Sequence, residues 1–254
     1  MESYLFGKNN YHIGTYDGRE YSRIYHWHIR KCAGTGFNLR FISTACNSNI
    51  DLAKKIKVAV HRSGGRAEYG GKVFASWNKR ILESGNYFYG HSHIPYHQLS
   101  LPGNTFTLTT LRDPVSRVVS HYKMIYEYSS MNIHHPCMRV EGQWLGSSGT
   151  LSEFASNMPK KHLMAQLYHY SSSFSAEEAC DCLASVNFVS RVEDLDAKGF
   201  SELNRIIPAL NFAPGKVRAS SADSRLISSD DIDHLRELLD LEYRFLEAAA
   251  QLVI

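Results

Sequence analysis

The sequence predicts an α/β fold, in which helices flank both faces of a parallel sheet within a single domain covering residues 1–254. Runs rich in β-branched and aromatic residues are typical of buried strands at 24–29, 86–91, 105–111 and 186–192. Apolar residues recur at helical spacing over 35–46, 73–84, 114–129, 150–170, 200–210 and 229–252. Such alternation of strands and helices favours a parallel sheet. A chain of 254 residues, 43% of them hydrophobic, can build one core of this kind.

The first predicted strand leads directly into a short turn and a helix. Residues 25–41 read YHWHIRKCAGTGFNLRF, and Phe37 and Phe41 lie on one face of the helix after the turn. Such a turn gathers unpaired backbone N–H groups at the positive end of the helix dipole, so it predicts a site for phosphate or sulfate. The basic residue, Lys31, precedes the glycines, whereas the lysine of nucleoside-triphosphate P-loops opens the helix. Taken alone, the Gly-Thr-Gly sequence is equally typical of an ordinary turn.

A second junction between strand and helix has the same character. Residues 106–122 read FTLTTLRDPVSRVVSHY, and the β-branched strand ends at Arg112. The Asp-Pro pair that follows can cap the helix and begin its first turn. Ser116 and Ser120 are four residues apart, so they share one face of that helix. Two anion sites at adjacent strand ends suit a ligand with two separated phosphate groups.

Together the two segments resemble the sulfotransferases that use 3′-phosphoadenosine 5′-phosphosulfate (PAPS), in particular the branch that contains heparan-sulfate 2-O-sulfotransferase. In that branch the 5′-phosphosulfate loop reads roughly H-I-P-K-T-A-G-T-S, and the 3′-phosphate motif reads L-R-D-P-x-x-R-x-x-S-x-Y. This chain has HIRKCAGTG and LRDPVSRVVSHY, in the same order. The second motif matches at nearly every diagnostic position. The first has Arg30, Cys32 and Gly36 where the family has proline, threonine and serine.

The resemblance implies a P-loop-like nucleotide-binding sulfotransferase fold that moves the sulfuryl group from PAPS to a hydroxyl in line, without a metal. It assigns Lys31 to the bridging or sulfuryl oxygens, where its charge is needed as the bond to sulfur breaks. The donor is expected to contact Arg30, Lys31, Ala33, Gly34, Thr35 and Gly36 at its 5′-phosphosulfate, Arg112 and Ser120 at its 3′-phosphate, and Arg218 and Ser220 in a late closing loop. The implied acceptor is a carbohydrate, and a glycan, a glycolipid and a small hydroxylated metabolite all remain open.

The segment Tyr-Gly-His91-Ser-His93-Ile-Pro resembles the H-x-H element that supplies the catalytic base in the same branch. A base is needed because a sugar hydroxyl is a poor nucleophile, and histidine takes up a proton near neutral pH. We expect His93 to be the base, because the Ile-Pro pair after it holds the backbone extended. His91 is expected to orient either His93 or the acceptor. The alternative is a pair of turn histidines bonded to neighbouring carbonyls. His26 and His28 alternate on a strand expected to be buried, where core histidines are the simpler interpretation.

Composition argues against several other kinds of partner. The net charge of +3 gives no general basic field, so we expect no nucleic-acid partner. The basic residues that fall in or near the two motifs are Arg30, Lys31, Arg40, Arg112, Arg117 and Lys123. No apolar run approaches the ~18 residues of a transmembrane helix. The N-terminus also lacks the pattern of a signal peptide, so a cytoplasmic location is expected.

Other chemistries fit the motifs less well. Five cysteines without framework spacing are expected to be free thiols. The groups His134-His135-Pro-Cys137 and Cys180-Asp-Cys182 are too tightly spaced for paired zinc ligands, so no metal site is expected. A cysteine phosphatase needs an arginine six residues after its nucleophile, but Asn38 stands six after Cys32. A P-loop kinase needs its lysine after the glycines.

Two questions stay open at this point. The loop at 131–149 is long, and it is either a lid over the substrate or a solvated insertion. The rival function is a catalytically inactive module that binds a 3′,5′-bisphosphate nucleotide. Retention of Lys31 together with His91 and His93 argues against that module, because binding alone does not need all three.

Overall fold

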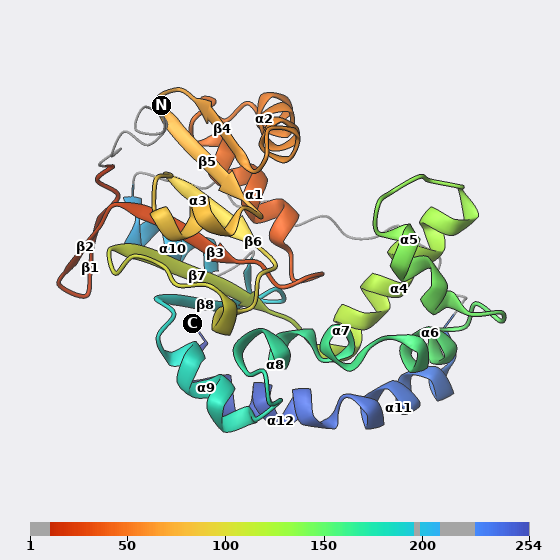
Figure 1. The fold of residues 1–254 in the computed structure, drawn as a ribbon. Helices are drawn as coiled ribbons and strands as arrows, with labels where there is room; N and C mark the ends of the chain where they lie inside the picture. The colour runs from red at the N-terminus through yellow and green to blue at the C-terminus, as the bar shows by residue number, and fades with distance from the viewer. Residues whose placement is uncertain (1–10, 196–198, 209–226, 254) are drawn as a thin grey trace.

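Six strands form a mostly parallel sheet at the centre of the molecule (Figure 1). The computed structural model describes residues 11–195, 199–208 and 227–253. The strands of the sheet are β3 (Arg23–Trp27), β4 (Arg66–Tyr69), β5 (Lys72–Ser76), β6 (Tyr89–Ser92), β7 (Thr105–Leu111) and β8 (Phe188–Arg191). They lie in the order β4-β5-β6-β3-β7-β8, and the edge strand β4 runs antiparallel to its neighbour. A separate hairpin consists of β1 (Gly14–Tyr16) and β2 (Arg19–Tyr21).

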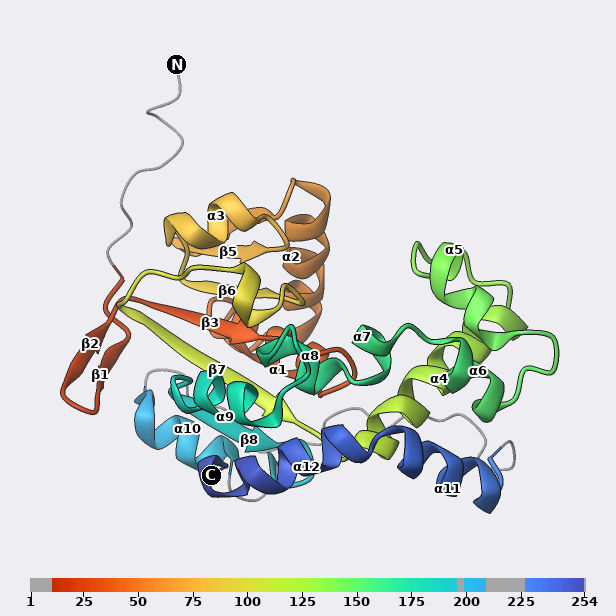
Figure 2. The ribbon, with the colours of Figure 1, turned by 60° about the horizontal axis from the view of Figure 1, so that its bottom comes forward.

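Helices cover both faces of the sheet (Figures 1 and 2). One face carries α1 (Gly34–Ser43), α2 (Ile50–Arg62) and α10 (Phe200–Ile206), and the other carries α3 (Lys79–Ser84), α8 (Ala165–Tyr170), α9 (Ala176–Ala184) and α12 (Asp240–Ala248). To one side of the sheet lie α4 (Pro114–Ser130), α5 (Met138–Glu141), α6 (Leu151–Asn157), α7 (Lys160–Leu163) and α11 (Ser229–Leu238). The 3-10 helices are η1 (Tyr96–Gln98), η2 (Gly142–Leu145) and η6 (Ala249–Leu252). None of the described helices combines the length and the apolar composition needed to cross a membrane.

The two cores follow from the alternation of side chains along each strand. In β3, Ile24 packs into the core under α1, whereas Tyr25 and Trp27 pack into the core under α8. Aromatic residues of α1 close the first core, and the ring of Phe41 stacks on that of Tyr89 with centroids 4.3 Å apart. Burial on both faces explains why the central strands read as continuous apolar and β-branched runs.

The predicted α/β class and the parallel sheet are confirmed, and the expected strands at 24–29, 86–91, 105–111 and 186–192 correspond to β3, β6, β7 and β8. The single helix expected at 73–84 is wrong. Its first half is the strand β5, because Val73 and Ala75 face one core and Phe74 faces the other. Only α3 is helical, and it begins where the Asn78 side chain accepts from Ile81 N.

Other expected elements differ in extent. The helix expected at 150–170 is divided into α6, α7 and α8. Pro159 lies between α6 and α7, and it cannot donate the hydrogen bond that a continuous helix needs. The helix expected at 229–252 is divided at Leu239 between α11 and α12. The elements α2, α9 and β4 were absent from the prediction. The loop at 131–149 contains α5 and η2. The end of the helix expected at 200–210 lies outside the described residues.

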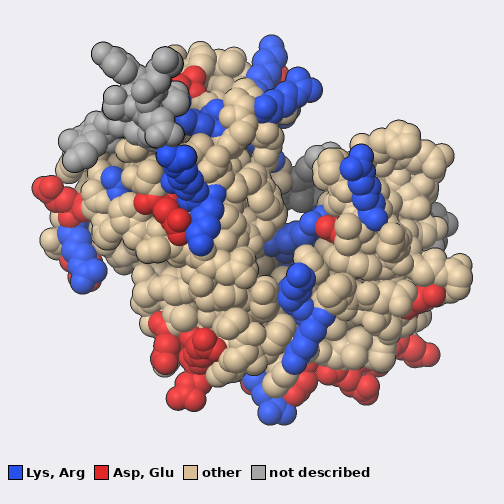
Figure 3. Space-filling model, in the orientation of Figure 1, with Lys and Arg blue, Asp and Glu red and all other residues tan. Residues whose placement is uncertain are grey.

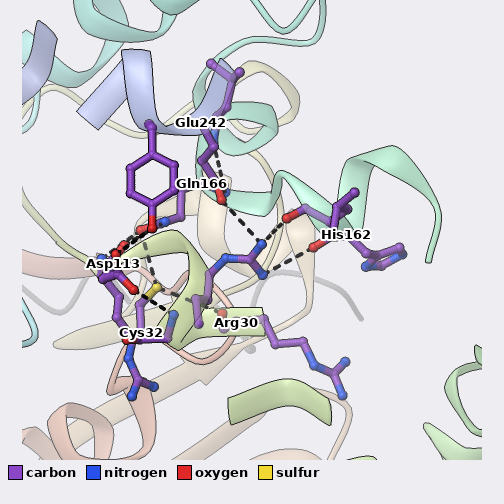
Figure 4. A network of polar contacts seen from close by, with 12 residues as sticks. Arg30, Cys32, Asp113, His162, Gln166 and Glu242 are labelled. Carbon is purple, nitrogen blue, oxygen red and sulfur yellow. Dashed lines mark hydrogen bonds and ion pairs between the residues drawn. The ribbon is translucent and has the colours of Figure 1, made fainter. Parts of the chain in front are cut away.

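A buried ion pair joins α4 to α12 (Figure 4). The Arg117 guanidinium lies 3.4 Å from Glu242 Oε2, and both side chains are fully buried. The same guanidinium donates to the carbonyl of His162, at 3.2 Å, and to the carbonyl of Leu163. The second Glu242 oxygen accepts from Gln166 N at 2.7 Å. Arg117 was counted among the charges near the anion motifs, but its burial gives it a structural part.

We expect Arg117→Met to lower the free energy of unfolding by ~3–5 kcal/mol, because it leaves Glu242 buried without its cation. The double variant Arg117→Met/Glu242→Gln removes that charge and keeps an oxygen for Gln166 N, so it should recover part of the loss. Urea unfolding of the two variants measures this difference.

The control is Arg236→Ala, which breaks the exposed pair of Arg236 with Asp233 on α11 and should change stability little. A double variant less stable than Arg117→Met would contradict the interpretation that the loss comes from an uncompensated Glu242 charge.

Candidate functional site

Two turns lie side by side where neighbouring parallel strands end. The Lys31 turn (residues 30–36) follows β3, and the Arg112 turn (residues 112–116) follows β7, which pairs with β3 as far as Trp27 and Thr109. Arg112 Nη1 donates to the Lys31 carbonyl at 3.1 Å. Thr110 Oγ1 donates to the Cys32 carbonyl at 2.5 Å. The structure therefore brings Lys31 and Arg112 to one edge of the sheet.

The backbone of the Lys31 turn differs from what its glycines suggest. The left-handed residues are Lys31, with φ 68°, and Ala33, with φ 57°, and the helix α1 begins at Gly34. Gly36 N donates to the Ala33 carbonyl at 2.9 Å, so its N–H is not available to an anion. No hydrogen bond among the described residues uses the N–H groups of residues 33, 34 and 35. The predicted group of four N–H donors thus becomes a group of three, with the exposed Thr35 side chain beside them.

Gly34 is needed for space rather than for a special φ. A Cβ at this position would come 1.8 Å from the Nε2 and Cδ2 atoms of His28. The imidazole of His28 therefore lies directly against the start of α1. This contact joins the end of β3 to the first turn of the helix, and nothing in the sequence pattern indicated it.

The Arg112 turn is held by side-chain hydrogen bonds. Asp113 accepts from Ser116 N at 2.7 Å and from the Tyr243 hydroxyl at 2.8 Å. Partial burial opposes ionisation of Asp113, but these bonds outweigh it and lower the pKa of the carboxyl. Gln166 accepts from Arg112 N at 2.7 Å and donates to the Arg112 carbonyl at 2.9 Å. Arg112 Nε is buried without a partner among the described residues, so it can donate to a bound anion.

Lys31 and Arg30 have different surroundings. Lys31 Nζ lies 3.6 Å from the sulfur of Met124. Burial, followed by the charges of Arg30 and Arg112, lowers the pKa of Lys31 to about 8. Both terminal nitrogens of Arg30 donate to the carboxylate of Glu141, each at 2.5 Å. Glu141 lies on α5, so this ion pair attaches the long loop at 131–149 to the Lys31 turn.

Glu141 also accepts from the imidazole of His121, with Nε2 and Oε2 2.8 Å apart. Partial burial opposes ionisation of Glu141, but the bond from His121 and the charge of Arg30 lower the pKa of the carboxyl. Burial lowers the pKa of His121 to about 4. Arg30 is therefore engaged by a carboxylate, although the motif predicted that it would contact the donor.

Four histidines gather at the carboxyl ends of β3 and β6. The ring centroid of His28 lies 4.2 Å from that of His93, 5.3 Å from that of His26 and 6.3 Å from that of His91. His93 Nδ1 donates to the His28 carbonyl, which can only accept. This bond leaves Nε2 of neutral His93 as the basic atom. His91 is only 3% exposed and pairs with His26 in the sheet register.

These rings are neutral at pH 7. Burial lowers the pKa of His93 to about 4, and its bond to the His28 carbonyl offsets only part of this effect. Burial and the neighbouring histidines lower the pKa of His28 and of His91 well below the ordinary value. In the described part of the chain, no group of three or more His, Cys, Asp and Glu side chains could hold a metal ion.

The remaining predicted site residues have mixed positions. Ser120 lies on α4, one turn beyond Ser116, and is partly exposed. Arg218 and Ser220 fall outside the described residues. Cys32 is fully buried, and burial raises the pKa of its thiol to about 12, so it has no nucleophilic character.

Figure 3 shows a hollow between the sheet and the part of the molecule that carries α4–α6, with Lys and Arg side chains in and beside it.

Comparison of the chain with protein-family models gives no match, and comparison with curated proteins gives none either. The arguments about function therefore come from the motifs and from the geometry at this edge of the sheet. There, a cation at each of two strand ends lies beside a neutral histidine and beside backbone N–H groups that have no partner in the described part of the chain.

We expect Gly34→Ala to lower the free energy of unfolding by ~1–3 kcal/mol, because its methyl group would overlap the His28 ring. Without that contact the change should stabilise the helix slightly, since alanine replaces glycine. Gly103→Ala is the matched control, because no atom lies within 4 Å of a Cβ there. Urea unfolding measures both, and a stability of Gly34→Ala equal to or above that of the unaltered protein would refute the assigned contact.

Proposed function

We propose that this protein is a sulfotransferase that moves the sulfuryl group of PAPS to a hydroxyl of a carbohydrate acceptor. The observation that carries the proposal is the pairing of the Lys31 turn with the Arg112 turn, joined by the 3.1 Å bond from Arg112 Nη1 to the Lys31 carbonyl. Their sequences, HIRKCAGTG and LRDPVSRVVSHY, are those that resemble the 5′-phosphosulfate and 3′-phosphate motifs of the family. One mostly parallel sheet, in the α/β class expected for such an enzyme, carries both turns.

The donor would be held by groups that have few other partners. The N–H groups of residues 33–35 and the hydroxyl of Thr35 would bind the 5′-phosphosulfate at the start of α1. Arg112 and Ser120 would bind the 3′-phosphate. The buried Nε of Arg112, which has no hydrogen-bond partner among the described residues, supports this assignment. Two attachment points fix the direction of the nucleotide along the edge of the sheet.

The transfer itself needs a cation at the leaving group and a base at the acceptor. In the proposed step the acceptor oxygen forms a bond to sulfur while the bond from sulfur to the bridging oxygen breaks, and its electron pair goes to the 5′-phosphate. Lys31 stabilises that developing charge. Nε2 of His93 takes the acceptor proton, because Nδ1 is already bonded to the His28 carbonyl. Because His91 is buried, His93 is the better candidate for the general base.

The rival proposal is an inactive module that binds the bisphosphate nucleotide. Its supporting observation is the pKa of about 4 for His93, which makes this imidazole a weaker base than a free one. Both proposals predict nucleotide binding, and only the sulfotransferase predicts transfer from labelled PAPS to an acceptor. A screen of hydroxylated acceptors with labelled PAPS therefore separates the two.

We expect adenosine 3′,5′-bisphosphate to raise the melting temperature by several degrees at ~100 times its dissociation constant. Adenosine 5′-monophosphate should raise it much less, because only a 3′-phosphate gives Arg112 Nε a partner. Arg112→Ala should remove the difference between the two nucleotides, whereas Arg236→Ala, at an exposed pair on α11, should keep it. Equal shifts by both nucleotides in the unaltered protein would remove the basis for the 3′-phosphate assignment.

We expect His93→Ala to lower turnover by ~10²–10⁴ while leaving bisphosphate affinity unchanged, because the base contacts the acceptor rather than the nucleotide. His91→Ala should do less damage to turnover. The measurement is the transfer rate and the bisphosphate affinity of both variants side by side. Full activity of both variants would exclude both histidines as the base. A loss of turnover in His91→Ala alone would identify His91, rather than His93, as the base.

The pH profile of the same reaction gives an independent check. The rate at low substrate should rise as His93 loses its proton near pH 4, and it should fall as Lys31 loses its proton near pH 8. In Lys31→Arg the fall above pH 8 should disappear, because arginine stays charged.

A further inference from the structure

Trp77 has an unusual backbone conformation at the carboxyl end of β5. Its φ is 59°, in the left-handed region, and Asn78 N donates across it to the Ser76 carbonyl at 2.7 Å. A three-residue turn of this kind is rare and strained. Glycine or asparagine would adopt it at less cost than a bulky aromatic residue. The local backbone conformation therefore does not explain why a tryptophan occupies this position.

The surrounding chain holds this turn in place. Ser76 N donates to the Gly65 carbonyl at 2.9 Å, before the turn. After it, Asn78 Nδ2 donates to the Gly64 carbonyl at 3.0 Å, and the Asn78 side chain caps α3. Because both sides are fixed, the backbone of Trp77 keeps a defined position. Strained residues that are held in this way are concentrated at functional sites.

The indole of Trp77 is exposed next to the proposed base. Trp77 is 46% exposed, whereas Trp27 and Trp144 are 2% and 6% exposed. Its ring centroid lies 4.7 Å from that of His93, and the two planes meet at 77°. The two rings thus contact each other edge to face, and the remaining exposed surface of Trp77 is open to a ligand.

The order of the strands sets out the functional groups in a row. Trp77 follows β5, His93 follows β6, Lys31 follows β3 and Arg112 follows β7, and these strands are neighbours in that order. Adjacent strands lie ~4.8 Å apart, so the row spans ~14 Å along one edge of the sheet. If the donor lies across Arg112 and Lys31, the acceptor must approach from the side of His93 and Trp77.

We propose that Trp77 is the platform on which the sugar ring of the acceptor lies, and this inference rests on the proposed function. A pyranose ring has an apolar face of C–H groups, and an exposed, rigid indole can remove that face from water. Contact with Trp77 would put a ring hydroxyl near Nε2 of the adjacent His93. The class of acceptor is therefore a pyranoside, selected by its ring face.

Binding is tested first, without any transfer. The probes are methyl β-glucoside, methyl β-galactoside and methyl α-mannoside, with the acyclic polyol sorbitol as the control. Because Trp77 is the exposed one of the three tryptophans, it should account for most of the fluorescence that acrylamide quenches. At least one glycoside should protect this fluorescence, and sorbitol should not. Protection by none of the glycosides would overturn the platform, whether or not a nucleotide binds.

Kinetics give the second test. Trp77→Asn removes the ring and suits the left-handed backbone, so the variant should fold. Its acceptor KM should rise about tenfold, as expected for the loss of one aromatic contact, while the bisphosphate melting shift stays unchanged. Trp77→Phe should lie between. Tyr69→Asn, which removes another exposed aromatic residue on β4, is the control and should leave the acceptor KM unaltered.

The outcomes of the two proposals are distinguishable. An unchanged acceptor KM in Trp77→Asn, with transfer from PAPS intact, would overturn the platform and leave the sulfotransferase standing. Transfer only to flat aromatic alcohols would overturn the assignment of a pyranoside. Failure of the unaltered protein to bind the bisphosphate would refute the proposed function. The fluorescence experiment would then still test, independently of the nucleotide, whether Trp77 binds a sugar ring.

Discussion

The side-chain amide of Gln166 connects the two turns on which the site is built. Its oxygen accepts from Arg112 N and from the Cys32 thiol, and its nitrogen donates to the Arg112 carbonyl. Gln166 is fully buried, and its own backbone N–H donates to Glu242 (Figure 4). Because a buried polar group is costly to leave without a partner, a shift of either turn would break bonds that water could not replace. The relative position of Lys31 and Arg112 depends on this network.

The ion pair of Arg30 with Glu141 likewise connects two segments of the candidate site. It joins the Lys31 turn to α5, in a loop that the sequence left as either a lid or a solvated insertion. A bidentate pair with one partner nearly buried fixes orientation as well as distance. The loop is therefore attached to the candidate site in the described structure, and the side chain that attaches it is an arginine that stands where the related motif has proline.

The sequence predicted the central strands and the meeting of the two turns, because buried strands have continuous apolar patterns and adjacent parallel strands end at one edge. It did not predict β5, because the short apolar run Val73-Phe74-Ala75 was expected to begin a single helix at 73–84. The contact of Glu141 with Arg30 joins residues 111 positions apart, and no local pattern encodes it. The overlap of His28 with the Cβ position of Gly34 likewise depends on tertiary packing.

Three residues with a strained backbone lie at the same edge of the sheet. Most residues with positive φ in the described chain are glycine, aspartate, asparagine or serine. The exceptions are Lys31, Ala33, Trp77 and Phe174, and the first three of these follow a strand of the sheet. Each such residue costs ~1–3 kcal/mol, a large share of the stability of a domain. The cost is sustained because hydrogen bonds and buried pairs on either side hold the backbone. A site held in this way is preorganised, so a ligand need not supply the free energy to order it.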